Sequence, residues 1–189
     1  ASFAMAQQAN HALPSGFQLD AYRIERQLSL GGFSIVYLAT DENGQFVAIK
    51  EYLPNTLALR SDGEIRPQIS EEHMPAFRYG MKCFFEEGRA LARLSHANVI
   101  RVLNFFRAND TVYMVMEYEH GRTLQEFIQK NRAVITENFI RNVFTKCLNG
   151  LREVHSHKLL HLDLKPSNIY MRNDYTPVLI DFGAARQTL

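Results

Sequence analysis

Residues 161–168 read HLDLKPSN, and this segment carries three chemically active side chains close together. They are the carboxylate of Asp163, the ammonium of Lys165 and the amide of Asn168. Groups of these kinds at this spacing can converge on a hydroxyl, a phosphate and a metal ion. Short apolar runs on both sides predict flanking strands, so we expect the segment to be a loop that carries chemistry.

Two further segments extend this pattern along the chain. Residues 181–183 (DFG) follow an apolar run, so Asp181 supplies a second carboxylate at the end of a strand, where oxygen ligands could hold Mg²⁺. Far upstream, Lys50 ends the apolar stretch 47–49, although a lone strand lysine is usually only a solvated side chain. Two acidic groups, an amide and two lysines in this order are the groups that phosphoryl transfer requires.

The N-terminal part of the chain has the pattern of an antiparallel sheet. Alternating apolar residues from Phe17 onward predict a hairpin with a glycine-rich turn. Further strands are expected at 45–50, 99–107 and 111–118. These segments predict a five-stranded antiparallel sheet.

The segment between the third and fourth strands contains an insertion and the main helix. Residues 51–75 carry several prolines and an Asp62-Gly63 turn signal, which predicts an irregular insertion with a small hairpin. Apolar residues at helical spacing then predict one helix from Ala76 to near His96.

The rest of the chain is expected to be mostly helical. Thr123 and Glu126 form a capping box, which predicts the start of a short helix. Thr136 can cap a longer helix that ends near His157, and the apolar residues of that helix follow a period near 3.6 and form a broad stripe.

These patterns predict an α+β protein with a disordered lead-in or cloning remnant at 1–16. A sheet-containing lobe is expected at 17–118 and a mostly helical lobe at 119–189.

The composition of the chain excludes several classes of function. There are 21 Lys and Arg against 20 Asp and Glu, for a net charge of +1, so neither nucleic acid nor a membrane surface is an expected partner. No apolar run reaches the roughly 18 residues of a membrane helix, and the polar N-terminal residues do not form a signal peptide. The 2 cysteines lack metal-site spacing. We therefore expect a cytoplasmic protein.

The order of the motifs resembles that of the protein kinase superfamily over residues 22–186. The resemblance rests on VAIK at 47–50, on the loop at 161–168 and on DFG at 181–183. It implies a kinase-like fold, in which the lobe at 17–118 is the small lobe with its sheet and helix, and the second lobe is a partial large lobe.

Finer sequence features narrow the resemblance within the superfamily. The pair Lys165-Pro166 is typical of serine/threonine kinases, and residues 47–54 (VAIKEYLP) and 179–186 (LIDFGAAR) look most similar to bacterial members. The resemblance implies an ATP-dependent serine/threonine protein kinase that transfers the γ-phosphate of Mg-ATP to a protein hydroxyl. It does not name the protein substrate.

The resemblance also assigns roles to individual residues. Lys50 would contact the α- and β-phosphates of ATP, and Glu87 would pair with it from the helix. Glu86 is a neighbouring competitor for this second role. Asp163 would accept the proton of the substrate hydroxyl, and Lys165 would neutralise the transferring phosphoryl group.

Asn168 and Asp181 would hold Mg²⁺. The adenine and phosphates of ATP would lie against the glycine-rich loop, the two strands beside it and the hinge, where Met116 takes the gatekeeper position. These nucleotide-binding residues are Gly31, Gly32, Val36, Ala48, Met116, Glu117 and Glu119.

Three departures from the family pattern have consequences. Ser29 and Ser34 stand where the glycine-rich loop usually has glycines, so we expect weaker nucleotide affinity. Leu162 replaces an arginine that pairs with a phosphorylated activation segment, so activity should not require that phosphorylation. Because the chain stops at Leu189, we expect no peptide-binding platform and weak substrate phosphorylation.

Two alternative functions remain open from the sequence. One is a pseudokinase or scaffold that binds nucleotide and acts through partners. The other is a small-molecule kinase of the aminoglycoside or choline type, against which Lys165 and the DFG segment argue.

The broad stripe of the helix at 136–157 also predicts self-association as a symmetric dimer. Its apolar residues are Phe139, Ile140, Val143, Phe144, Cys147, Leu148, Leu151 and Val154.

Overall fold

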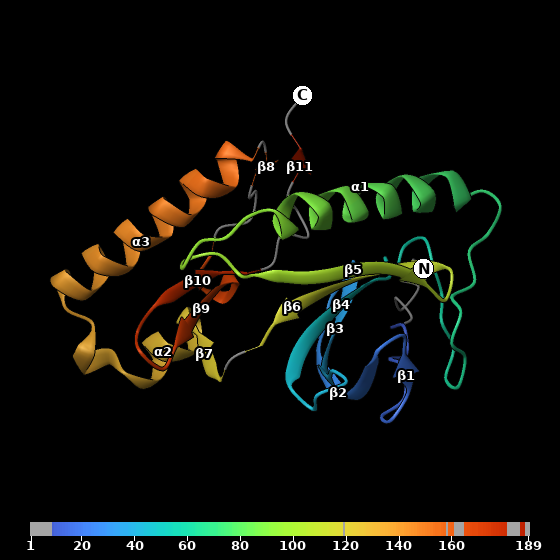
Figure 1. Ribbon diagram of the computed structural model, residues 1–189, viewed down its shortest axis with the longest axis horizontal. Helices are drawn as coiled ribbons and strands as arrows, with labels where there is room; N and C mark the ends of the chain where they lie inside the picture. Colours follow the sequence, from blue (N-terminus) through green and yellow to red (C-terminus); the bar gives the residue numbers. More distant parts are fainter. Residues whose placement is uncertain (1–8, 119, 158, 161–164, 181–185, 188–189) are drawn as a thin grey trace, which may run out of the picture. The chain divides into compact units, whose positions relative to one another are not determined.

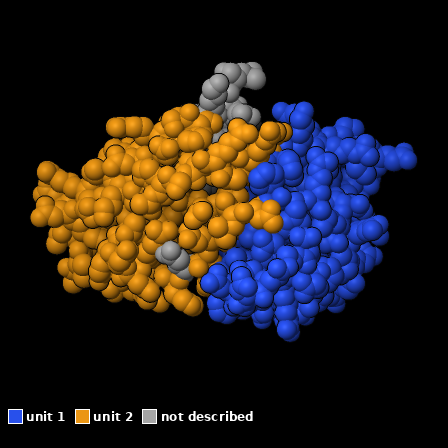
Figure 2. Space-filling model, in the orientation of Figure 1, with its two compact units in different colours: residues 1–85, 105–115 blue, residues 86–104, 116–189 orange. Residues whose placement is uncertain are grey.

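The computed structural model describes residues 9–118, 120–157, 159–160, 165–180 and 186–187. The chain forms two compact units (Figure 2). The first unit comprises residues 1–85 and 105–115, and the second comprises residues 86–104 and 116–189.

A six-stranded sheet, drawn in Figure 1, organises the N-terminal part of the chain in the order β1-β2-β3-β4-β6-β5. Its strands are β1 (Gln18–Leu19), β2 (Tyr22–Leu30), β3 (Ser34–Thr40), β4 (Phe46–Tyr52), β5 (Val102–Ala108) and β6 (Thr111–Glu117). The sequence pattern predicts five of these six strands. The sixth, β1, has only two residues, too few for an alternating pattern to mark it.

Helix α1 (Met74–Ala92) is the main helix after the insertion. It begins one residue before Pro75, because a proline in the first turn loses no intrahelical hydrogen bond. The helix ends earlier than the expected His96, in a tight turn in which the amides of Arg93 and Leu94 bond carbonyls three residues back. Within the first unit, the ring of Tyr52 on β4 lies 5.2 Å from that of Phe77 on α1.

The insertion contains the small hairpin that the sequence predicts. Leu59 pairs antiparallel with Gln68, and Gly63 at the turn has a φ of 80°, a conformation that glycine adopts without steric cost.

Residues 10–13 differ from the expected disordered lead-in, because they pack against this insertion. The side chains of Asn10 and Leu13 are 5% and 4% exposed. The Asn10 amide donates to the Ala58 carbonyl over 3.2 Å and accepts from the Arg60 amide over 2.7 Å. The lead-in prediction missed this packing because the partners lie about fifty residues away and leave no local pattern. We call residues 10–13 the N-terminal segment.

In its described residues, the second unit contains the two expected helices, together with short strands and two short 3-10 helices. Their bounds are β7 (Gly121–Thr123), α2 (Leu124–Lys130), η1 (Arg132–Val134), α3 (Glu137–Ser156), β8 (Leu159–Leu160), η2 (Pro166–Asn168), β9 (Ile169–Arg172), β10 (Pro177–Leu179) and β11 (Arg186–Gln187). Both predicted caps are confirmed: the hydroxyls of Thr123 and Thr136 accept from the amides of Glu126 and Phe139, each over 3.2 Å.

The apolar stripe of α3 divides into a covered and an open row. Val143, Cys147 and Val154 are buried, whereas the side chains of Ile140 and Phe144 are 56% and 61% exposed. In the part of the chain that the structure describes, no helix combines the length and apolar character needed to cross a membrane.

Candidate active site

Lys50 lies near the end of β4 and is almost completely covered, with 5% of its surface exposed. It stands opposite Val36 in the antiparallel pairing of β3 with β4. Because alternate residues of a strand share a face, Val36, Ala48 and Lys50 lie on the same face of this hairpin. The structure therefore brings together three of the residues that the sequence predicts for nucleotide binding.

The turn between β2 and β3 carries Gly31 and Gly32. The Gly31 amide donates to the Ser34 carbonyl over 2.9 Å, and the Gly32 carbonyl accepts from the Asn55 amide over 2.9 Å. Neither glycine has φ in the left-handed region, so the backbone conformation itself does not require glycine. A Cβ atom at Gly32 would meet no atom within 4 Å.

The missing side chain at Gly32 thus leaves open space above the loop backbone. Open space beside backbone amides is what a phosphate group needs for close approach. The residues of this turn fit the phosphates of a nucleotide. Ser29 is exposed and Ser34 half-buried.

The predicted hinge begins at the end of β6. Met116 and Glu117 are both half-buried. The Glu117 amide donates to the Arg101 carbonyl over 3.0 Å, and its carboxylate lies 3.9 Å from the Arg172 guanidinium. Glu119 lies outside the described residues.

Glu87 and Glu86 differ in burial along α1. Glu87 is 7% exposed and Glu86 is half-buried, so the helix turns Glu87 to its more covered side. Lys50 belongs to the first unit and Glu87 to the second, and their pairing stays a prediction.

The segment around Asn168 is held by two backbone hydrogen bonds. Asn168 is 5% exposed in the short helix η2, and its amide donates to the Lys165 carbonyl over 2.8 Å. The Ile180 amide donates to the Asn168 carbonyl over 3.1 Å. Ile180 directly precedes Asp181, so this bond ties the Asn168 loop to the start of the DFG segment.

The remaining predicted site residues can be placed only in part. Lys165 is exposed, as a residue that meets an incoming substrate would be. Asp163 and Asp181 lie outside the described residues. Among the residues that are described, no cluster of His, Cys, Asp or Glu could hold a metal ion, so the proposed Mg²⁺ site depends on Asp181 together with the amide of Asn168.

One residue pair near the site was missed from the sequence. Glu51, next to Lys50, forms a buried ion pair with Arg60 of the insertion. The sequence gives no sign of this pair, because a charged residue in an irregular loop normally indicates a solvated surface.

Comparison with known proteins identifies the family and the fold of the chain. A family model described as protein kinase domain matches residues 22–189. The chain is 34% identical over 164 residues to serine/threonine-protein kinase B of Synechocystis sp. and 30% identical over 169 residues to a probable serine/threonine-protein kinase PknB of Lactococcus lactis. These matches cover 86% and 88% of the chain, but only 26% and 24% of the two relatives.

A solved structure titled PpkA-294 apo form superposes with a TM-score of 0.82 at 34% identity. The match covers 91% of this chain and 62% of that one. The kinase-like α+β fold and the similarity to bacterial serine/threonine kinases are therefore confirmed. The chain belongs to the protein kinase domain family.

Proposed function

We propose that this chain carries the catalytic centre of a serine/threonine protein kinase that uses Mg-ATP and phosphorylates a protein hydroxyl. The observation that carries the proposal is the shared face of Val36, Ala48 and Lys50 on the β3–β4 hairpin. The Lys50 ammonium lies at the covered end of an apolar strand. Burial strengthens its charge interactions, so it could bind the phosphates of a nucleotide whose adenine ring lies on the same face.

The proposal assigns nucleotide-binding and metal-binding roles to named residues of this chain. When bound, Mg-ATP would supply the γ-phosphoryl group, with the charge of its phosphates screened by the metal ion. Lys50 binds the α- and β-phosphates, with Glu87 orienting its ammonium. Asn168 and Asp181 hold the metal ion.

The acid–base step belongs to the 161–168 loop. Asp163 would accept the proton that the substrate hydroxyl loses as its oxygen bonds to the γ-phosphorus. The bond from that phosphorus to the β–γ bridging oxygen would break, so that ADP leaves, and Lys165 would neutralise charge on the phosphoryl group in transfer. Val36 and Ala48 would contact the adenine from the sheet. Backbone groups of Glu117 and Glu119 would hydrogen-bond its edge, beside Met116.

The positions at which this chain departs from the family pattern also enter the proposal. Ser29 and Ser34 lower nucleotide affinity, and Leu162 frees activity from activation-segment phosphorylation. We place the protein in the cytoplasm.

Two measurements on the same samples test the proposal. Mg-ATP at about 100 times its dissociation constant should stabilise the protein by about 2.7 kcal/mol in a thermal-shift titration, and the Lys50→Met variant should lose this shift. Radiolabelled ATP should label a generic protein substrate, and Asp163→Asn should remove most labelling while it keeps the shift. No shift at millimolar Mg-ATP would reject the nucleotide site. A shift without any transfer would favour the scaffold function.

A further inference from the structure

A buried polar network surrounds the carboxylate of Glu51, the residue next to Lys50. Glu51 Oε1 accepts from Tyr37 Oη over 2.8 Å and from Arg60 Nη2 over 2.5 Å. Glu51 Oε2 accepts from Arg60 Nη1 over 2.9 Å and from Tyr113 Oη over 2.6 Å. The side chains of Glu51 and Arg60 are both 0% exposed.

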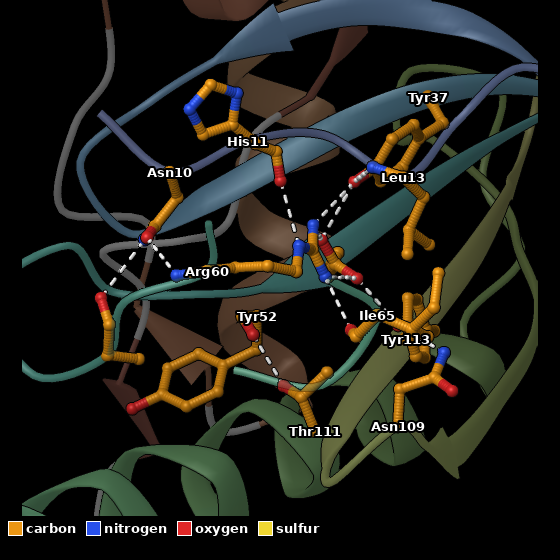
Figure 3. Close-up of polar contacts among 12 residues, drawn as sticks. Asn10, His11, Leu13, Tyr37, Tyr52, Arg60, Ile65, Asn109, Thr111 and Tyr113 are labelled. Atoms are coloured by element: carbon orange, nitrogen blue, oxygen red, sulfur yellow. Dashed lines mark hydrogen bonds and ion pairs between the residues drawn. The ribbon is translucent and has the colours of Figure 1, made fainter. Parts of the chain in front are cut away.

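Arg60 lies at the centre of this network, as Figure 3 shows. Besides its two bonds to Glu51, its Nε donates to the His11 carbonyl over 2.8 Å. Its Nη1 donates to the Ile65 carbonyl over 3.3 Å, and its Nη2 to Tyr37 Oη over 3.0 Å. One guanidinium therefore joins the N-terminal segment, the insertion, β3 and β4.

The charge state of the network is stable. Burial alone would lower the pKa of Arg60, but the hydrogen bonds and charge of Glu51 raise it overall. Burial and the nearby charge of Glu51 raise the pKa values of Tyr37 and Tyr113, so both phenols stay protonated and continue to donate. Each oxygen of Glu51 keeps two donors.

Stability alone is a weak explanation for such a network. Removing two charges from water costs several kcal/mol per ion, and replacing a buried ion pair by apolar residues of similar volume is often neutral. The best-attested role of buried ionic groups is to specify one register among several. In this chain the buried network contacts β4, so β4 is the strand whose register it could specify.

The register of β4 decides which side chain faces the proposed phosphate site. Lys50 and Glu51 are successive strand residues and therefore point to opposite faces. A slip of one residue would exchange the two faces and put a carboxylate in place of the ammonium. The network holds Glu51 on one face, and on the other face Tyr52 packs against Phe77 and Phe84.

We propose that Arg60 is a positioning residue for Lys50 and acts through Glu51. By holding Glu51, Arg60 keeps the end of β4 in the register that presents the Lys50 ammonium to the phosphates of ATP. This inference rests on the proposed function and extends the nucleotide site to the insertion and the N-terminal segment.

The test compares Mg-ATP with adenosine, which lacks phosphates. The main variant replaces the whole network by apolar groups: Tyr37→Phe, Glu51→Leu, Arg60→Met and Tyr113→Phe together. We expect a cooperative unfolding transition, at least about a tenfold rise in the dissociation constant for Mg-ATP, and a much smaller rise for adenosine. A general loss of structure would weaken both ligands.

A second variant, Arg60→Lys, keeps the charge but loses the planar fork of donors. It should weaken Mg-ATP selectively as well, and it decides the question if the fourfold variant does not fold. The matched control is Arg66→Met in the same insertion, because the Arg66 side chain is 75% exposed and its ion pair with Asp110, at 3.9 Å, lies at the surface. This control should bind both ligands like the unaltered chain.

The outcomes separate the inference from the proposed function. If the unaltered chain and Lys50→Met bind Mg-ATP equally, the phosphate role of Lys50 is wrong and the inference falls with it. If Lys50→Met loses Mg-ATP but the Arg60→Lys variant keeps the original preference for Mg-ATP over adenosine, only the inference is overturned.

Discussion

The backbone amide of Ile180 donates a hydrogen bond to the carbonyl of Asn168 over 3.1 Å. This bond joins the loop that carries the proposed proton acceptor to the strand that leads into Asp181. It lies within the second unit, and it places Asn168 and the chain entering the DFG segment side by side. A metal ion shared by Asn168 and Asp181 would need this proximity.

The first prediction concerns the metal role of Asn168. Asn168→Ala removes a neutral oxygen ligand, so the Mg²⁺ concentration needed for half-maximal ATP stabilisation should rise about tenfold. Adenosine binding, which needs no metal, should not change. The neighbouring Ser167→Ala is the control. An unaltered Mg²⁺ dependence in Asn168→Ala would reject its assignment as a ligand.

The second prediction compares Gly32, whose Cβ position is open, with Gly121, whose Cβ position is filled by neighbouring atoms. In Gly32→Ala the added methyl group meets no atom within 4 Å, so the free energy of unfolding should change by less than about 1 kcal/mol. Affinity for Mg-ATP should fall, because the methyl group occupies the space that we assign to phosphate.

Gly121→Ala is the contrasting variant. Its Cβ would clash with the Met171 carbonyl oxygen, so it should destabilise the β7–β9 pairing by about 1–3 kcal/mol. Chemical denaturation and calorimetric titration measure the two quantities. A Gly32→Ala protein that binds Mg-ATP like the unaltered chain would remove the phosphate role of the loop.

Local patterns predicted those elements whose partners are close in sequence. The cap of Thr123 on Glu126 spans three residues, and the 3.6-residue period of α3 repeats along one helix. The Arg60 network could not be predicted in this way, because Arg60 contacts His11 and Tyr37, which lie 49 and 23 residues away. Only the folded sheet brings these groups together.

The same contrast applies within the candidate site. Lys50, Asn168 and the glycine turn belong to short motifs whose spacing carries the signal. The link from Asn168 to Ile180 is a backbone contact, and backbone contacts between distant segments leave no trace in residue types.

The third prediction is a pH dependence of stability. Burial, with the charge of Glu51, raises the pKa values of Tyr37 and Tyr113, and burial raises the pKa of Tyr52 to about 12. In the unfolded chain a tyrosine titrates near pH 10. The folded state keeps protons that the unfolded state loses, so this stability is present below about pH 10 and is lost as the pH rises through the folded pKa values.

Denaturant unfolding at a series of pH values between about 9 and 12 measures this loss. Tyr37→Phe should reduce the dependence, whereas Tyr79→Phe, at a side chain that is 71% exposed, should leave it unchanged. If ultraviolet absorbance shows every tyrosine of the native protein ionising together near pH 10, the buried network is not formed in solution.

The fourth prediction concerns the open row of α3. Ile140, Phe144 and Leu148 are 56%, 61% and 43% exposed at successive turns of the helix. Full burial of a large apolar side chain contributes roughly 1.5–3 kcal/mol, so covering the exposed half of each would contribute about 1 kcal/mol. We propose that two copies of this chain cover the row in a symmetric dimer. Sedimentation equilibrium at tens of micromolar should show the dimer, and Phe144→Ser should shift it to monomer while Asn142→Ala does not. A monomer at this concentration would reject the proposal.

The fifth prediction concerns the N-terminal segment. Deletion of residues 1–13 removes the Leu13 side chain, which is 4% exposed, and both hydrogen bonds of the Asn10 amide. Burial of Leu13 should contribute roughly 1.5–3 kcal/mol and each hydrogen bond about 0.5–1.5 kcal/mol, so the free energy of unfolding should fall by about 3 kcal/mol or more. Deletion of residues 1–8 removes none of these contacts and serves as the control. Urea unfolding of the two shortened chains measures the difference. Equal stability of the two would show that residues 10–13 do not belong to the folded unit in solution.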